Sequence, residues 1–195
     1  MLLHELVLKN RSYRRFDQTV RVERETLLEC VDLARLSASG ANAQPLKFCL
    51  STEPSLNAEI FSTLSWAGYL KDWPGPAEGE RPSAYIVVLL DTHLRKDPGC
   101  DHGIAAQSML LGAVERGLGG CILGSIKKQE LSDVLSLEAH FEILLVLALG
   151  KPVENVVVEA VGSDGDIKYW RDADGVHHVP KRPLSDLIVE PASAQ

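Results

Sequence analysis

Positive charge is scarce in this 195-residue chain, in which 20 Lys and Arg residues face 27 Asp and Glu residues for a formal net charge of −7. A nucleic-acid partner is therefore not expected, because phosphate backbones are bound by basic surfaces. Long apolar runs are also missing, since the longest, residues 143–149, is too short to cross a bilayer. No leader with a charged and then an apolar part opens the sequence, so neither secretion nor a membrane partner is predicted.

Cysteine is sparse, and its spacing suits neither a metal site nor a disulfide framework. The four cysteines contain no C-x-x-C pair, and three of them lie in apolar surroundings. We therefore expect reduced, buried thiols and a cytoplasmic protein. The adjacent His177 and His178 are not a metal motif, because neighbouring side chains of a strand point to opposite faces. One of these two histidines is expected to be exposed, and no metal site is predicted.

The composition otherwise suits a globular protein, with 45% hydrophobic and 24% charged residues. Because no repeat or linker divides the chain, residues 1–195 are predicted to form a single domain with a substantial core. Apolar periodicity predicts helices over 2–8, 24–36, 57–64 and 127–135, the last capped by Ser125. Strands are predicted over 46–51, 83–91, 121–123 and 141–150. An extended arm is expected over 155–161, and a hairpin should join 167–171 to 176–179.

A further, very apolar helix is predicted to begin at Asp101, and its alanines allow close packing on more than one side. Asp101 is in the first turn, where a carboxylate meets the positive end of the helix. Gly117, Gly119 and Gly120 are expected to end this helix in a turn that needs positive φ. Gly124 then leaves bare backbone after a short strand. Taken alone, this segment is explained as a helix that only organises the core.

Three arginines and a serine crowd five residues near the start of the chain. In an extended chain, Arg11 and Arg15 share a face with Tyr13. A curled chain instead brings Arg11, Ser12 and Arg14 around one anion, and the planar guanidinium group suits phosphate. A solvated basic turn is the alternative interpretation of such a segment.

A loop of small and amide residues, 37–45, follows the helix predicted over 24–36. Asn42 and Gln44 carry both donors and acceptors, so they suit the edge of a heterocycle. A polar connection whose amides only satisfy the local backbone is the alternative. The segment Trp66–Pro82, rich in aromatic residues, proline and glycine, is interpreted as a lid or an interface patch, or else as a long loop anchored in the core.

Four motifs occur in a fixed order: R-S-x-R from Arg11, N-x-Q-P from Asn42, D-x-G-I-A-A-Q from Asp101 leading to G-L-G-G, and K-R-P-L from Lys181. In this order the chain resembles the nitroreductase family of FMN-dependent NAD(P)H oxidoreductases, over nearly its whole length. The resemblance implies an α+β fold in which helices wrap a mixed central sheet. It also implies a domain-exchanged homodimer, with each flavin site built from both subunits.

The resemblance implies that Arg11 and Ser12 hold the FMN phosphate, joined from the far end of the chain by Lys181 and Arg182. Arg14 would approach the flavin ring, where a fixed cation stabilises the negative charge that develops during reduction. The partner subunit would contribute the amide loop, and the backbone that ends the strand at 121–123 would lie on one flavin face. The implied cofactor-binding residues are Arg11, Ser12, Tyr13, Arg14, Ala38, Ser39, Gly40, Asn42, Gln44, Leu123, Gly124, Lys181 and Arg182.

The implied reaction passes hydride from NAD(P)H through flavin N5 to a small electrophile, such as a nitroaromatic or quinone, by a ping-pong mechanism. No catalytic side chain is needed beyond Arg14, because the flavin carries the redox chemistry. Leu46 and Leu123 depart from many relatives, which have an aromatic and an acidic residue there, and both bear on acceptor preference. Two alternatives are a flavoenzyme of the same fold that dehalogenates, dehydrogenates or destroys flavin, and a non-catalytic anion-binding dimer.

Overall fold

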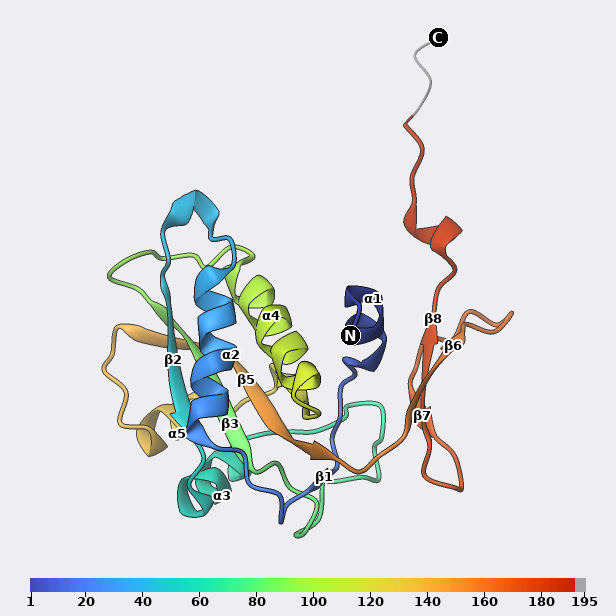
Figure 1. Ribbon diagram of the computed structural model, residues 1–195, viewed down its shortest axis with the longest axis horizontal. Helices are drawn as coiled ribbons and strands as arrows, with labels where there is room; N and C mark the ends of the chain where they lie inside the picture. Colours follow the sequence, from blue (N-terminus) through green and yellow to red (C-terminus); the bar gives the residue numbers. More distant parts are fainter. Residues whose placement is uncertain (192–195) are drawn as a thin grey trace.

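The computed structural model (Figure 1) describes residues 1–191, so the last four residues of the predicted domain lie outside the described part. Its centre is a five-stranded sheet in which β5 lies between β3 and β4, β2 pairs with the other side of β3, and β1 pairs with the end of β5. All of these strand pairs are antiparallel, and the parallel pairing expected of a mixed sheet is limited to an isolated bridge between Ser12 and Gly120 of β4. The strands are β1 (Phe16–Asp17), β2 (Leu46–Ser51), β3 (Ala84–Asp91), β4 (Gly119–Leu123) and β5 (Phe141–Pro152).

Helices cover both faces of this sheet, and the residues of β3 alternate between the two cores. Ile86 and Val88 pack with α2 (Arg24–Leu36) and α4 (Asp101–Glu115), while Tyr85 and Val87 pack with α3 (Pro54–Ser62) and α5 (Lys128–Val134). The short helix α1 (Leu3–Lys9) packs against α4. The α+β fold with helices around a central sheet is therefore confirmed. Within residues 1–191, no helix has the length and apolar character needed to cross a membrane.

A second, smaller sheet stands beside the main body, next to α1 (Figure 1). It consists of β6 (Val156–Ala160), β7 (Trp170–Arg171) and β8 (His177–Lys181), followed by the 3₁₀ helix η2 (Leu184–Leu187). β8 pairs in parallel with β6 and antiparallel with β7, so this smaller sheet is mixed. The predicted hairpin is confirmed.

Two of the glycines behind α4 have a different role from the one expected. Gly117 has a φ of +73° and ends the helix, but Gly119 and Gly120 belong to β4. A Cβ atom at Gly120 would lie 2.7 Å from the carbonyl oxygen of Ala148, and one at Gly119 would lie 2.5 Å from the ring of Tyr13. These two positions therefore need glycine because neighbouring groups approach the backbone closely.

Smaller differences concern helix ends and thiols. α3 begins three residues earlier than expected, with Pro54 in the first turn, where proline is favoured. Ser125 does not cap α5, because the residue at the N-cap position is Lys127. Among the cysteines, all of them free, Cys30 and Cys121 are buried and Cys100 is exposed.

Candidate functional site

The basic segment at the start of the chain runs beside β4. Ser12 forms a parallel bridge with Gly120, and the backbone N–H of Tyr13 donates to the Gly120 carbonyl oxygen at 3.0 Å. This pairing is the parallel contact at the edge of the central sheet. It places the arginines of the segment next to β4, the strand that ends at Leu123 and Gly124.

We call the cavity beside this segment the anion pocket. It has a volume of about 230 Å³. Three cations, Arg11, Arg14 and Lys181, line it, and no carboxylate does. Residues from the two ends of the sequence thus meet there, because β8 carries Lys181 to the N-terminal segment. The lining residues are Asn10, Arg11, Ser12, Arg14, Tyr169, His177, Val179 and Lys181.

Arg14 is held by residues that no sequence motif indicated. Its backbone N–H donates to the carboxylate of Glu154, whose side chain is 1% exposed and also accepts from Arg171 Nη2 at 3.0 Å. Its guanidinium lies 4.8 Å from the ring centroid of Tyr169, and its Nη1 lies 3.3 Å from Nε2 of His177. Glu154 carried no sequence signal, since it lies in a polar stretch between two predicted strands.

His177 is buried and neutral near pH 7. Burial, followed by the nearby guanidinium groups of Arg14 and Arg171, lowers its pKa to about 4. Because arginine only donates, the neutral imidazole accepts from Arg14 at Nε2. The pocket therefore takes its positive charge from Arg11, Arg14 and Lys181 and none from this histidine.

The expectation that one histidine of the pair is exposed is wrong. His178 lies between Glu159 Oε2, at 2.9 Å from Nδ1, and Asp172 Oδ2, at 3.1 Å from Nε2. Its ring also stacks on Trp170, with centroids 4.1 Å apart. Hydrogen bonds to the two carboxylates raise the pKa of His178, because the imidazolium donates to both.

Some of the predicted site residues lie outside the anion pocket. The Tyr13 hydroxyl donates to the Lys9 carbonyl oxygen at 3.0 Å, and Arg182 is exposed on the chain after β8. Leu123 is buried in the core. Gly124 is exposed, and a Cβ atom there would meet nothing within 4 Å.

Asp101, at the start of α4, anchors the amide loop. Its Oδ2 accepts from Ser39 Oγ at 2.6 Å, and its Oδ1 accepts from the Gly40 N–H at 2.9 Å. The loop backbone is strained, since Asn42 and Gln44 have φ values of 53° and 49°. Such strain persists only where surrounding bonds impose it, and it is commonest at functional sites.

The amide loop borders a second cavity of about 220 Å³, lined in part by Ala38, Ser39, Gln44 and Leu46. Gly40 and Asn42 lie in the 3₁₀ turn η1 (Gly40–Asn42) above it. This cavity shares no lining residue with the anion pocket. In Figure 1 the loop joins α2 to β2 at the top, away from α1 and β8 on the right. One chain therefore does not bring the two predicted halves of the site together.

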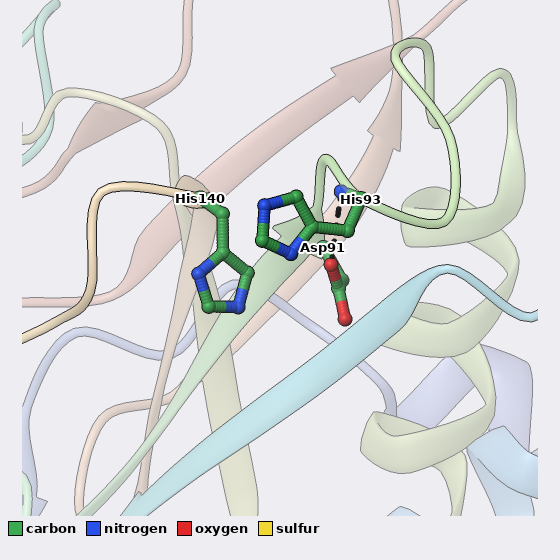
Figure 2. A group of neighbouring side chains, drawn as sticks. All are labelled: Asp91, His93 and His140. Atoms are coloured by element: carbon green, nitrogen blue, oxygen red, sulfur yellow. Dashed lines mark hydrogen bonds between the residues drawn. The ribbon is translucent and has the colours of Figure 1, made fainter.

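Asp91, His93 and His140 form a separate cluster at the end of β3 (Figure 2), with possible ligand atoms within 4.8 Å of one another. The two imidazole rings stack with centroids 4.2 Å apart and an interplanar angle of 6°. Imidazole lone pairs lie in the ring plane, and nearly parallel planes share no point where both could bind one ion. The observed rotamers therefore suit stacking and do not suit chelation.

The segment Trp66–Pro82 is anchored in the core, which agrees with the second interpretation given above. Trp66 is buried in the core, and a Cβ atom at Gly75 would lie 2.7 Å from its ring. Tyr69 is exposed and packs on Tyr169, with ring centroids 4.9 Å apart. Trp66 thus anchors the segment, and Tyr69 reaches the edge of the anion pocket through Tyr169.

With this geometry established, comparison with known proteins identifies the class. The model of the Nitroreductase family matches residues 7–71 and 90–151, and the chain belongs to this family of oxidoreductases. The resemblance expected from the four motifs is confirmed, although the match ends before Lys181.

Solved structures share the fold. The NADPH:FMN oxidoreductase from Vibrio harveyi complexed with NAD+ has a TM-score of 0.69 and 20% identity, covering 98% of this chain and 78% of that chain. A nitroreductase family protein from Clostridium difficile 630 has the same TM-score and identity, with 98% and 99% covered. An FMN-dependent nitroreductase from Clostridium difficile R20291 has a TM-score of 0.63 and 20% identity, with 78% and 89% covered.

The neutral state of His177 makes stability depend on pH. Its pKa is about 4 when folded and about 6.5 when unfolded, so the unfolded chain binds the proton more readily. The stabilising contribution is complete above pH 6.5 and declines as the pH falls toward 4, by about 3 kcal/mol at most. We expect His177→Gln to reduce this decline when the free energy of unfolding is measured in urea at several pH values. His4→Gln, at an exposed position on α1, should behave as wild type. Equal pH dependence in wild type and His177→Gln would contradict this account of His177.

Proposed function

We propose that the protein is an FMN-dependent NAD(P)H oxidoreductase that reduces a nitroaromatic, quinone or similar small electrophile. The observation that carries the proposal is the convergence of Arg11, Ser12, Arg14 and Lys181 in one carboxylate-free pocket. A phosphate dianion suits such a pocket, because guanidinium groups bind phosphate oxygens with charge-assisted hydrogen bonds. FMN, when bound, supplies the two-electron chemistry between NAD(P)H and the acceptor.

Orphaned donors support this assignment. The Nε atoms of Arg11 and Arg14 are buried and have no hydrogen-bond partner in the described part of the chain. Buried donors are rarely left unpaired, so a ligand with several acceptor oxygens accounts for both. Because His177 is neutral, it does not repel the Arg14 guanidinium and instead accepts a hydrogen bond from it. This contact keeps the guanidinium fixed toward the pocket.

Arg14 is the residue that we expect to stabilise the reduced state. Its backbone is held by Glu154, and its guanidinium is held by Tyr169 and His177, so the charge is fixed in place before reaction. A charge held in this way needs little reorganisation when negative charge develops nearby. The exposed backbone at Gly124 leaves room for a planar ring beside β4.

We further propose that a second copy of this chain supplies the amide loop to each site. Within one chain no residue of the loop lines the anion pocket, and the loop lies away from α1 and β8 (Figure 1). In addition, α1 has no buried residue, and both it and the C-terminal segment expose large apolar side chains. Surfaces of this kind are normally covered by a partner. The exposed apolar residues include Leu2, Leu3, Leu8, Leu184, Leu187, Ile188 and Val189.

The first test concerns Arg14. The purified protein should bind added FMN, as followed by the visible absorbance of the protein-bound flavin. Arg14→Ala should weaken this binding by about tenfold or more, because a charge-assisted contact is lost. Reduction of the flavin by NADH or NADPH should also slow in a stopped-flow experiment. Lys128→Ala removes an exposed cation on α5 and should change neither property. Equal behaviour of the two variants would refute the role of Arg14.

The shared site is tested by hybrid dimers. One chain carries Arg14→Ala and the other carries Asn42→Ala with Gln44→Ala, and each parent alone should bind FMN poorly. In the hybrid, one site receives both damaged parts, while the other pairs an intact anion pocket with an intact loop. A hybrid purified through two different tags should therefore bind one FMN with wild-type affinity. Recovery of no site would show that the loop and the pocket do not meet across subunits, and strong FMN binding by the loop variant alone would remove the loop from the site.

A further inference from the structure

A cavity of about 310 Å³ lies between the turn after β1, the start of α3 and the segment that enters β3. It shares no lining residue with the anion pocket or with the cavity under the amide loop. The apolar part of its wall includes Pro54, Phe61 and Pro82, and hydroxyl, carboxamide and guanidinium groups form the polar part. The cavity therefore combines an apolar side with a polar, positively charged side.

Three buried polar atoms on this wall have no hydrogen-bond partner among residues 1–191: Arg81 Nε, Ser83 Oγ and the Tyr85 hydroxyl oxygen. All three residues line the cavity: Arg81 and Ser83 lie in the segment before β3, and Tyr85 is the second residue of that strand. Buried polar groups are nearly always paired, and three orphans on one cavity wall indicate a missing partner. The anion pocket carries the same signature on Arg11, Arg14 and His177.

Neighbouring residues hold Arg81 and Ser83 in place but do not form hydrogen bonds with their orphaned polar atoms. The Arg81 guanidinium lies 4.4 Å from the ring centroid of Phe61, and the Arg81 backbone N–H donates to Gln18 Oε1 at 3.2 Å. Asn57 Nδ2 donates to the Ser83 carbonyl oxygen at 2.8 Å and leaves the Ser83 hydroxyl free. The polar wall is thus built in advance of any ligand.

The charge of the wall is positive. Arg21 and Arg81 line the cavity, and no Asp or Glu does. Neither arginine forms an ion pair with a carboxylate in the part of the chain that the structure describes. Burial raises the pKa of Tyr85 far above its usual value, so its phenol remains a donor at neutral pH. Donors and cations without an acidic neighbour favour an anion.

We propose that this cavity is a binding site for a small organic acid, with its carboxylate bound by Arg81, Ser83 and Tyr85. Arg21 adds a second positive charge at the same wall, and Phe61 and Pro82 cover the apolar body of the acid. A single ordered water would pair with one or two of the hydroxyl groups but would leave the partly buried Arg81 guanidinium without a counter-ion.

Calorimetric titration of the full-length protein, with and without added FMN, tests this site with benzoate and inorganic phosphate as probes. We expect benzoate to bind under both conditions and more tightly than phosphate. Arg81→Met and Tyr85→Phe should each weaken benzoate binding by about tenfold or more. Arg24→Met removes the same charge from the exposed start of α2 and should leave binding unchanged.

Tyr85→Phe keeps the test decisive if Arg81→Met fails to fold. It removes only an unpartnered buried hydroxyl, so the melting temperature without benzoate should not fall. Three results would overturn the proposal: no benzoate binding, binding unaffected by both substitutions, or tighter binding of phosphate than of benzoate. Because the same titration runs without FMN, its outcome does not depend on the flavin site.

Discussion

A buried carboxylate holds the candidate site together. Glu154, with a side chain that is 1% exposed, binds the backbone N–H of Arg14 on one side and the guanidinium of Arg171 on the other. A carboxylate in this position is favourable only because donors surround it, since an unpaired buried charge is very costly. It joins the N-terminal basic segment to the small sheet, which brings Lys181 to the anion pocket. Arg14 adds a second link, because its Nη1 lies 3.3 Å from Nε2 of His177 in β8.

Rigid placement of positive charge is the common theme of the anion pocket. Three contacts fix Arg14: its backbone N–H donates to Glu154, its guanidinium lies over the Tyr169 ring, and its Nη1 contacts His177. His177 remains neutral because burial and two neighbouring guanidinium groups oppose its protonation. The pocket therefore keeps a constant charge near neutral pH, which suits a phosphate anchor. The amide loop is fixed in a comparable way, through Asp101 and strained backbone.

Much of the fold could be predicted from the sequence, because apolar periodicity reports directly on burial. α2 and β2 have the predicted bounds, and the buried strands β3 and β5 differ by only one or two residues. The placement of Gly119 and Gly120 in β4 was missed. A glycine that allows a turn and a glycine that allows a close neighbour cannot be told apart in a sequence. The direction in which each strand of the central sheet runs was not predictable, because strand direction depends on tertiary connections.

The motifs pointed to Arg11, Ser12, Arg14 and Lys181, which do meet in one pocket. The residues that support them were not predictable. Glu154 lies in no motif, and His177 could be placed on a strand but not on its buried face without knowledge of what covers it. Arg182 belongs to the K-R-P-L motif and Tyr13 fills the variable position of R-S-x-R, yet neither side chain lines the pocket. A motif identifies a segment, and only packing decides which of its side chains face a ligand.

The comparison of FMN with riboflavin, which lacks only the phosphate, tests the central claim most directly. Titration of the purified protein with each flavin, followed by visible absorbance or fluorescence, gives the two dissociation constants. If the cations of the anion pocket bind the phosphate, FMN should bind about a hundredfold or more tightly than riboflavin. Equal affinities of the two flavins, or failure of FMN to bind, would contradict the account.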